Sequence, residues 1–367
     1  GDGVKTLVVG GTGPTGPAIV AGLAERGHDI TICHTGSHEL PEVDGYRHIH
    51  TDVRNHDALA STIGSEAWDA AIVTYGRLRT IAEVLRGQVG HFVSVGGGPA
   101  YRGYFDPWRH SPPGLPAPVA EDAPTSTEAD DGKSYRIAAT ERQLFEHQPE
   151  ATHFRYPWVY GPRQLAPREW SVVRRILDNR PHIVLPDGGA MLNTFGFTEN
   201  LAHALLLAVD QPGQAKGEIF NAADDECLTI RQVVEICATE LDHEWELISM
   251  PADLARPAWP LLAGPTSHHR LFDTSKLRTR LGYRDVVPAR EAVARTARWL
   301  ADNPPERGGQ TEQIIEDPFD YENEDLLIEW WRTAIARPPE LAWRFPPGYG
   351  LAYAGPGTSY QRPDTRI

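Results

Sequence analysis

Three glycines near the start of the chain have the spacing that phosphate binding requires. They form the pattern Gly10-x-x-Gly13-x-x-Gly16, which follows an apolar run and precedes a helical pattern over Pro17–Arg26. Glycines let a backbone approach a pyrophosphate closely, and the N–H groups and dipole of a helix N-terminus favour an anion. A second strand-like run, Asp29–Cys33, provides the context of a dinucleotide-binding loop. We therefore predict that a dinucleotide contacts Gly10, Thr12, Gly13, Pro14, Thr15 and Gly16.

A second group of residues could transfer protons. Lys133 and Tyr135 lie at the start of a helical pattern over Ser134–Gln148. A free tyrosine has a pKa of about 10, and lowering this pKa by three units requires that the ionised form be stabilised over the protonated form by about 4 kcal/mol. A cation four residues later supplies part of this, but Ala139 stands there, and residues two apart do not share a helix face. The candidate catalytic residues are Tyr135, Lys133, Ser94 and Tyr101.

Strand and helix patterns alternate along the first half of the chain. Strands separated by helices predict a parallel sheet that is covered on both faces. The fold class is therefore α/β, a doubly wound Rossmann sheet. The predicted strands are Thr6–Val9, Asp29–Cys33, Tyr46–Ile49, Ala70–Thr74, Gly90–Val95, Thr152–Tyr156 and Glu218–Asn221. The predicted helices are Pro17–Arg26, Asn55–Ile63, Thr80–Arg86, Ser134–Gln148, Glu169–Asn179, Asn200–Val209, Thr229–Leu241, Ala289–Asp302 and Glu322–Ala336.

The organisation of domains follows from these patterns. Residues 1–165 form the dinucleotide-binding domain, and residues of about 190–223 complete its sheet. Residues 166–303 form a smaller, interleaved substrate lobe. Residues 304–367 form an aromatic, proline-rich extension, which we expect to wrap over the body or a partner subunit, or to be partly disordered. The long loop at 96–127 is aromatic too, and we expect it to form one wall of a substrate crevice.

Composition narrows the classes of partner. The chain has 367 residues, is 40% hydrophobic and carries a formal net charge of -15. An acidic chain without basic runs is a poor binder of nucleic acid or anionic membranes. The cysteines Cys33, Cys227 and Cys237 show no disulfide pattern. No apolar stretch approaches membrane-spanning length, and the first strand leaves no room for a signal peptide. We expect a cytoplasmic protein that binds a small molecule.

Several further motifs occur in an order that resembles the extended short-chain dehydrogenase/reductase family, in its epimerase/dehydratase group. The resemblance covers Thr6 to about Asn303 and includes the glycine loop. It implies that Asp52 and its neighbour Val53 contact adenine, and that Pro157 and Val159 border the nicotinamide. The other matching segments are His50–Arg54, Arg155–Pro162, Phe197–Ala202, Phe220–Ala222 and Phe272–Lys276.

The chain departs from this family at the residues that perform its chemistry. The family uses a Tyr-x-x-x-Lys pair together with a Ser or Thr after the fifth strand. In one alignment Tyr135 takes the Tyr position and Ala139 the Lys position. In the other, Glu141 matches the family's downstream Glu, and Lys133 and Ile137 take the two positions. The Ser or Thr position falls on Gly96 or Gly97, so the resemblance implies a non-standard acid/base.

The residues after the second and fourth strands bear on the choice of cofactor. Enzymes that use NAD usually carry a carboxylate after the second strand, whereas NADP enzymes place donors there. This chain carries His34, Thr35 and Ser37 there, which favours NADP slightly over NAD. Thr74 and Tyr75 follow the fourth strand, at the edge of the sheet that faces the cofactor, and Tyr75 is a further hydroxyl that could act as acid/base.

Three functional hypotheses remain open. The first is an NAD(P)-dependent oxidoreductase that acts on a small, apolar or aromatic carbonyl or alcohol. The second is an epimerase or lyase that uses a bound cofactor, and the third is a dinucleotide-binding sensor without catalysis. No metal is expected, because the pair His268-His269 lacks a third ligand at metal spacing. A homodimer is possible in this family.

Overall fold

The computed structural model describes residues 3–11, 13–34, 41–74, 77–345 and 356–357. The chain divides into two compact units, residues 1–320 and residues 321–367. The second unit contains the helix α13 (Tyr321–Ile335). Within the described residues, no helix combines the length and the apolar character needed to cross a bilayer.

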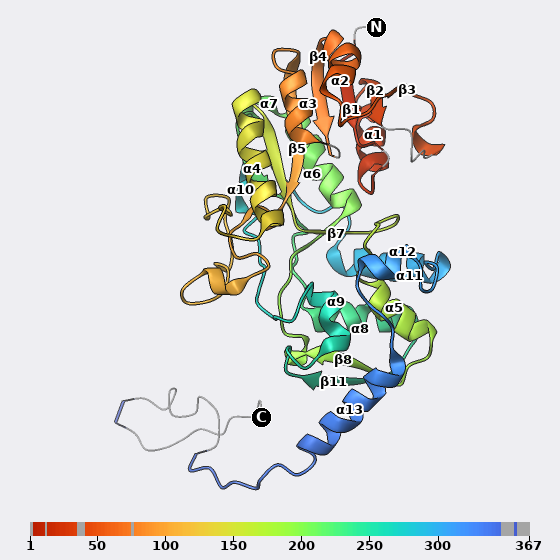
Figure 1. Cartoon of the computed structure of the whole chain (residues 1–367), viewed down its shortest axis with the longest axis vertical. Coiled ribbons are helices and arrows are strands. Elements are labelled where there is room, and N and C mark those ends of the chain that lie inside the picture. The colour runs from red at the N-terminus through yellow and green to blue at the C-terminus, as the bar shows by residue number, and fades with distance from the viewer. Residues whose placement is uncertain (1–2, 12, 35–40, 75–76, 346–355, 358–367) are drawn as a thin grey trace. The chain divides into compact units, whose positions relative to one another are not determined.

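A seven-stranded parallel sheet forms the centre of the first unit (Figure 1). Its order is β10-β6-β5-β4-β1-β2-β3, so the strand order reverses on either side of β1. The predicted doubly wound sheet is confirmed, and the ends of the predicted strands and helices lie within two residues of those observed. The strands are β1 (Lys5–Val9), β2 (Asp29–His34), β3 (Arg47–His50), β4 (Trp68–Val73), β5 (Val89–Gly97), β6 (Thr152–Tyr156) and β10 (Ile219–Asn221).

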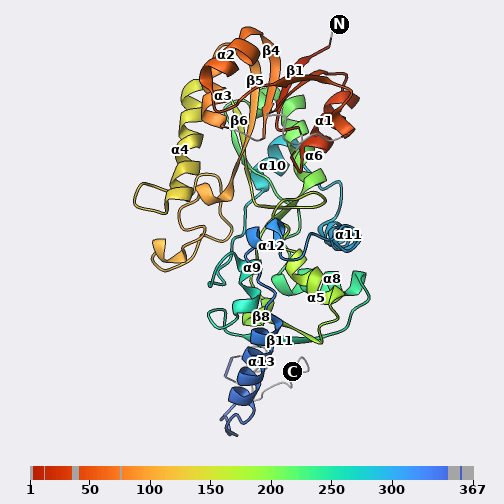
Figure 2. The same ribbon diagram turned by 45° about the vertical axis from the view of Figure 1, so that its right-hand side comes forward.

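Helices cover both faces of this sheet, as Figure 2 shows. One face carries α1 (Gly16–Glu25), α6 (Thr198–Asp210) and α10 (Ser275–Leu281). The other carries α2 (His56–Thr62), α3 (Leu78–Val84) and α4 (Gly132–His147). The short helix α7 (Pro212–Ala215) follows α6.

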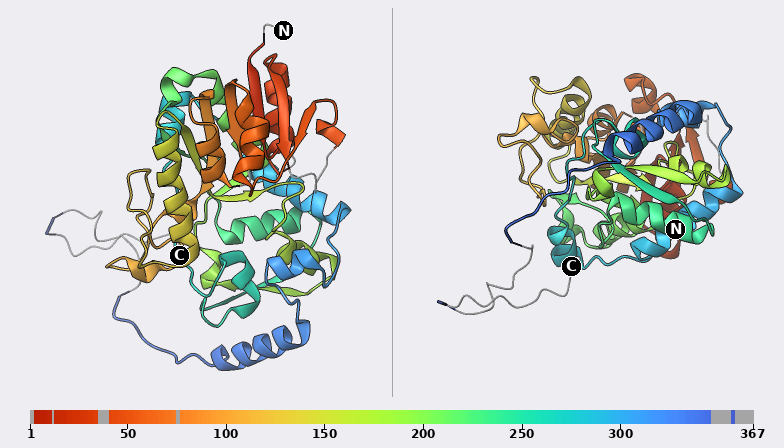
Figure 3. Two further views of the ribbon diagram at one scale, coloured as in Figure 1. Left: turned by 45° about the horizontal axis from the view of Figure 1, so that its top comes forward. Right: turned by 90° about the horizontal axis from the view of Figure 1, so that it is seen from below.

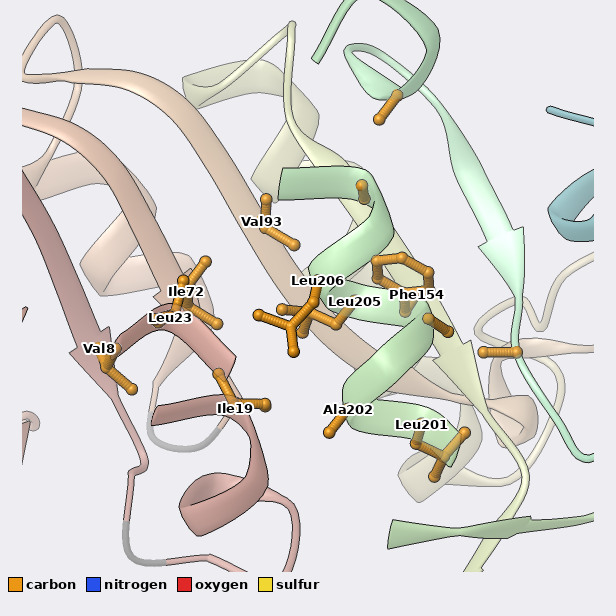
Figure 4. Close-up of a cluster of buried hydrophobic side chains, with 14 of the residues drawn as sticks. Val8, Ile19, Leu23, Ile72, Val93, Phe154, Leu201, Ala202, Leu205 and Leu206 are labelled. Carbon is orange, nitrogen blue, oxygen red and sulfur yellow. The ribbon is translucent and has the colours of Figure 1, made fainter. Parts of the chain in front are cut away.

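A large cluster of buried apolar side chains lies between the sheet and the helices α1 and α6 (Figure 4). Val8 and Ile72 from the sheet meet Leu23 from α1 and Leu205 from α6, and each is fully buried. The two helices pack closely, because a side chain at Gly22 would lie 2.2 Å from Leu206. This packing holds the beginning of α1, and with it the glycine loop, against the sheet.

The smaller lobe lies beyond the carboxyl ends of the sheet strands (Figures 1 and 3). Its two pairs of parallel strands are β8 with β11 and β7 with β9, and none of these four strands was predicted from the sequence. The lobe consists of β7 (Trp158–Tyr160), β8 (His182–Pro186), β9 (Phe195–Phe197), β11 (Glu246–Met250), α5 (Trp170–Leu177), α8 (Ile230–Glu240), α9 (Trp259–Leu262), α11 (Ala289–Asp302) and α12 (Gln310–Ile314).

Candidate functional site

The glycine loop joins β1 to α1 as the sequence predicts. Gly10 has a φ of 101°, a conformation that favours glycine. A side chain at Gly16 would lie 2.2 Å from the carbonyl oxygen of Gly11, so only glycine allows the helix to start this close to the strand. The side chain of Thr15 does not cap α1, and the first turn contains no acidic residue. This loop therefore fits the pyrophosphate of a dinucleotide.

The other predicted cofactor contacts gather at the same edge of the sheet. His34 ends β2, Asp52 and Val53 follow β3, and Thr74 follows β4. The hydroxyl of Thr74 lies 3.3 Å from the carbonyl oxygen of Gly10, so β4 and the glycine loop are in contact. The predicted contacts Thr12, Thr35, Ser37 and Tyr75 lie outside the described residues.

A cleft of about 1040 Å³ opens beside the carboxyl ends of β5 and β6. Pro157 and Val159 line it, as do several residues of α4. The aromatic rings in its lining are those of Tyr104, Phe105, Tyr135, Tyr156 and Trp158. Its cationic side chains are those of Arg77, Arg79, Lys133, Arg136 and Arg168. This charge contrasts with the acidic chain as a whole and favours an aromatic ligand that carries negative charge.

Helix α4 presents Lys133, Ile137 and Glu141 to the cleft. These residues follow one another at intervals of four and so lie on one helix face. Tyr135, Ala139 and Gln143 line the cleft at the same spacing, so the lining agrees with both alignments. The position of the family's lysine falls on Ile137 in one alignment and on Ala139 in the other, so it carries no cation in either.

Lys133 and Tyr135 both reach the cleft, but their surroundings differ. The ammonium of Lys133 lies 5.9 Å from the centre of the Phe105 ring. The hydroxyl of Tyr135 donates a hydrogen bond of 3.1 Å to Glu128 at the surface. Neither arrangement reproduces a tyrosine beside a lysine, and their catalytic roles stay predictions.

Tyr101 lies in the core instead of the cleft. It is fully buried in a small cluster with Tyr104 and Phe272, and its hydroxyl donates a 2.5 Å hydrogen bond to the side chain of Asn221. Burial raises the pKa of Tyr101 to about 12, which makes it a poor acid/base near neutral pH. Of the aromatic loop that we expected to form a wall, Tyr104 and Phe105 line the cleft, whereas Trp108 is exposed.

The sequence analysis missed His153, which is the histidine in the lining of this cleft. Its Nδ1 lies 2.8 Å from the hydroxyl of Ser94, and its Nε2 lies 3.5 Å from a carboxylate oxygen of Glu141. A side chain at Gly96 would lie only 2.6 Å from that Nε2. The imidazole therefore occupies the space where the family's Ser or Thr would project, and Ser94 contacts the site through His153.

Glu141 is held ionised behind this histidine. Burial raises its pKa, but hydrogen bonds from His153 and Arg155 lower it to about 2. The guanidinium Nε of Arg155 donates a 3.0 Å hydrogen bond to the carboxylate. The result is a buried Ser94–His153–Glu141 row that fixes the ring of His153 in orientation.

Tyr156 supplies a further polar group. Its side chain lines the cleft, and its buried hydroxyl has no hydrogen-bond partner among the described residues. Burial raises the pKa of Tyr156, so the hydroxyl stays protonated. Because an unpaired buried hydroxyl costs free energy, it favours a ligand that accepts a hydrogen bond from it.

Comparisons with known proteins agree with this architecture. No protein-family model matches the chain. An uncharacterised protein of Sinorhizobium fredii is 25% identical over 170 residues, which span 47% of its length. A 3-diazoavenalumate denitrifying reductase of a Streptomyces species is 24% identical over 311 residues, covering 78% of this chain and 97% of that protein. A UDP-glucose 4-epimerase of Corynebacterium glutamicum is 26% identical over 300 residues, covering 69% of this chain and 83% of that protein.

Solved structures show the same fold. A UDP-galactose 4-epimerase covers 82% of this chain at 16% identity, with a TM-score of 0.60. The Bordetella bronchiseptica enzyme WbmG in complex with NAD covers 87% at 17% identity, with a TM-score of 0.64. These comparisons agree with the resemblance drawn from the sequence: the chain has the fold of NAD-dependent epimerases and dehydratases, and its sequence is similar to that of a reductase and of an epimerase.

Proposed function

We propose that this protein is an NAD(P)-dependent reductase of a small aromatic compound that carries a carboxylate. The observation that carries this proposal is the cleft beside β5 and β6, whose walls combine aromatic rings with cationic side chains. The Streptomyces relative, which this chain matches over 97% of that protein's length, is itself named a reductase.

The glycine loop would hold the pyrophosphate of the cofactor, and Pro157 and Val159 would border its nicotinamide. When bound, the nicotinamide supplies hydride. We favour NADP over NAD, because His34 ends β2 at the place where NAD-dependent folds commonly carry a carboxylate. The neighbour WbmG holds NAD, so the comparison of the two cofactors is the first measurement to make.

Substrate recognition would use the aromatic rings and the cationic side chains of the cleft together. Arg168 stacks over the ring of Trp158 at 4.6 Å, and both line the cleft. Such a pair offers a flat apolar surface beside a fixed positive charge, which suits an aromatic carboxylate. The hydroxyl of Tyr156 would donate a hydrogen bond to a polar substituent of the same substrate.

For a carbonyl substrate, we propose that Nε2 of His153 gives the proton to the carbonyl oxygen. This atom is directed toward Gly96 and Glu141, both of which line the cleft. Ser94 and Glu141 hold the ring in orientation through contacts with its two nitrogens. Lys133 and Tyr135 are the alternative donors that the sequence suggests.

The decisive experiment measures loss of NADH and of NADPH with 4-acetylbenzoate and with neutral acetophenone. We expect faster turnover of the carboxylate, and His153→Gln should lower kcat at least a hundredfold. The control is His91→Gln, because His91 is a buried histidine of β5 that bonds Thr152 and is not part of the cleft lining. Equal losses in the two variants, or binding of neither cofactor, would overturn the proposal.

The name of the Streptomyces relative, which is matched over 97% of its length, indicates a reaction of a diazo compound and so suggests a second candidate reaction. Replacement of a diazonium group by hydride releases N₂, consumes one NAD(P)H and needs no proton from the protein. That requirement suits a site without the Tyr-x-x-x-Lys pair. The test substrate is 4-carboxybenzenediazonium, measured against its rate without protein. Turnover that His153→Gln leaves unchanged would assign this reaction; no protein-dependent turnover would exclude it.

A further inference from the structure

Three histidines meet at the carboxyl ends of β2 and β3, the two strands that lie farthest in the sheet from the strands β5 and β6 beside the cleft. His34 ends β2, and His48 and His50 lie two residues apart on β3. In the parallel register His34 pairs with His50, and Ile32 pairs with His48. Side chains of paired and alternate residues share one face of a sheet, so all three imidazoles project to the same side. One ring nitrogen from each lies within 4.8 Å of the others.

The hydrogen bonds of His48 settle which of its nitrogens faces the cluster. Its Nε2 lies 2.7 Å from the carbonyl oxygen of Val43, which can only accept, so Nε2 carries the proton. In the neutral ring, Nδ1 then has a lone pair, and this atom lies 2.9 Å from Nε2 of His34. A backbone carbonyl on the outer nitrogen is the usual way in which a protein orients a histidine toward a metal.

The spacing of the rings agrees with a common metal ion. Tetrahedral zinc binds imidazole nitrogens at about 2.0–2.1 Å, which separates two such nitrogens by roughly 3.4 Å. The distance between His34 and His48 is slightly shorter than that. The centre of the His50 ring lies 4.4 Å from that of His34 and 6.2 Å from that of His48. Because His50 is exposed, a small rotation of its side chain brings the third nitrogen to the same point.

We propose that His34, His48 and His50 bind a zinc ion, with Nε2 of His34 and Nδ1 of His48 as two of its ligands. Imidazole ligands suit Zn²⁺, and three of them leave a fourth position for water. For Nε2 of His34 to bind the ion, the proton that it now donates to His48 would move to Nδ1 of the same ring, so that His34 binds as a neutral imidazole. The ion would join the ends of β2 and β3, and the proposal does not depend on the reductase activity.

The test uses the full chain, freed of metal by a chelator and then titrated with Zn²⁺ in competition with a chromophoric indicator. We expect one equivalent of zinc per chain, and His50→Ala should weaken its binding at least tenfold. A Co²⁺ titration should give the absorption bands of a tetrahedral site in the parent chain and not in the variant. The matched control is His56→Ala, an exposed histidine of α2 outside the cluster.

Folding is checked separately, because His48 also bonds the backbone of Val43. The test therefore relies on the exposed His50, with His50→Gln as a second variant of similar size, and circular dichroism verifies the fold of each. Binding of less than one equivalent of zinc by the parent chain would overturn the proposal. Equal zinc affinity in His50→Ala and His56→Ala would overturn it as well.

Discussion

At the scale of single residues, the backbone around the glycine loop restricts which residue type can occupy position 16. Gly16 is buried at the start of α1, with the carbonyl oxygen of Gly11 where a side chain would be. A backbone atom cannot move aside as a flexible side chain can. The identity of this residue therefore follows from the approach of the helix to the strand.

We predict that Gly16→Ala lowers cofactor affinity at least tenfold and destabilises the fold by about 1–3 kcal/mol, because the added methyl displaces the loop. Calorimetric titration and urea unfolding measure the two effects. The control is Gly213→Ala, since a side chain at Gly213 meets no atom within 4 Å. Unchanged affinity in the Gly16 variant would show that the loop does not contact the cofactor.

The stability of the fold should depend on the negative charge of the Glu141 carboxylate. Its carboxylate is buried against Arg155, so Glu141→Gln would leave a buried guanidinium without its partner and should cost about 3–5 kcal/mol. Glu146→Gln, an exposed substitution on the same helix, should cost little. Urea unfolding of the two variants at neutral pH gives the comparison, and similar losses would contradict the ion-pair explanation.

The same carboxylate makes stability depend on pH. Because its pKa falls from 4.5 to about 2 on folding, its contribution is present above pH 4.5 and is lost as the pH falls through about 2. Glu141→Gln should therefore flatten the curve of unfolding free energy against pH in that window, relative to the parent chain.

At the scale of elements, capping explains why a helix begins where it does. The side chain of Thr229, which precedes α8, accepts a 3.0 Å hydrogen bond from the backbone N–H of Gln232, and the backbone N–H of Thr229 donates one to the side-chain oxygen of Gln232. The sequence predicts this cap from the threonine before an apolar-periodic segment. The structure adds the reciprocal half of the capping box.

We predict that Thr229→Ala lowers the free energy of unfolding by about 1 kcal/mol, and that Thr229→Ser retains most of it, because the hydroxyl is the capping group. Thermal unfolding followed by circular dichroism measures both variants. Equal destabilisation by alanine and serine would attribute the effect to the lost methyl instead of the cap.

Element positions were more predictable than element partners. Every predicted strand and helix occurs within two residues of its predicted ends, because period and turn residues are local signals. The pairing of β8 with β11 joins segments about sixty residues apart and has no such signal. The same holds for the chain after Asn303, where Asp317 forms a buried ion pair with Arg175 of α5.

At the scale of the whole molecule, the first unit combines the sheet and the lobe in one compact body. A ligand that binds only the folded state stabilises that state, by about 2.7 kcal/mol at a concentration of one hundred times its Kd. We predict that a saturating cofactor slows the hydrogen exchange of slowly exchanging amides in the lobe as well as in the sheet. Protection restricted to the sheet would mean that the lobe unfolds independently.

What the sequence by itself determined is the local structure: the strand, glycine turn and helix that we propose to bind phosphate, and the order of motifs that indicates the fold. These are short-range patterns, written in neighbouring residues. Only the tertiary structure decided which side chain lies where the family's Ser or Thr would project. His153 enters the space above Gly96 because β6 lies beside β5, and His34 meets His48 because β2 lies beside β3. Such contacts depend on strand pairing between distant segments, which no local pattern specifies.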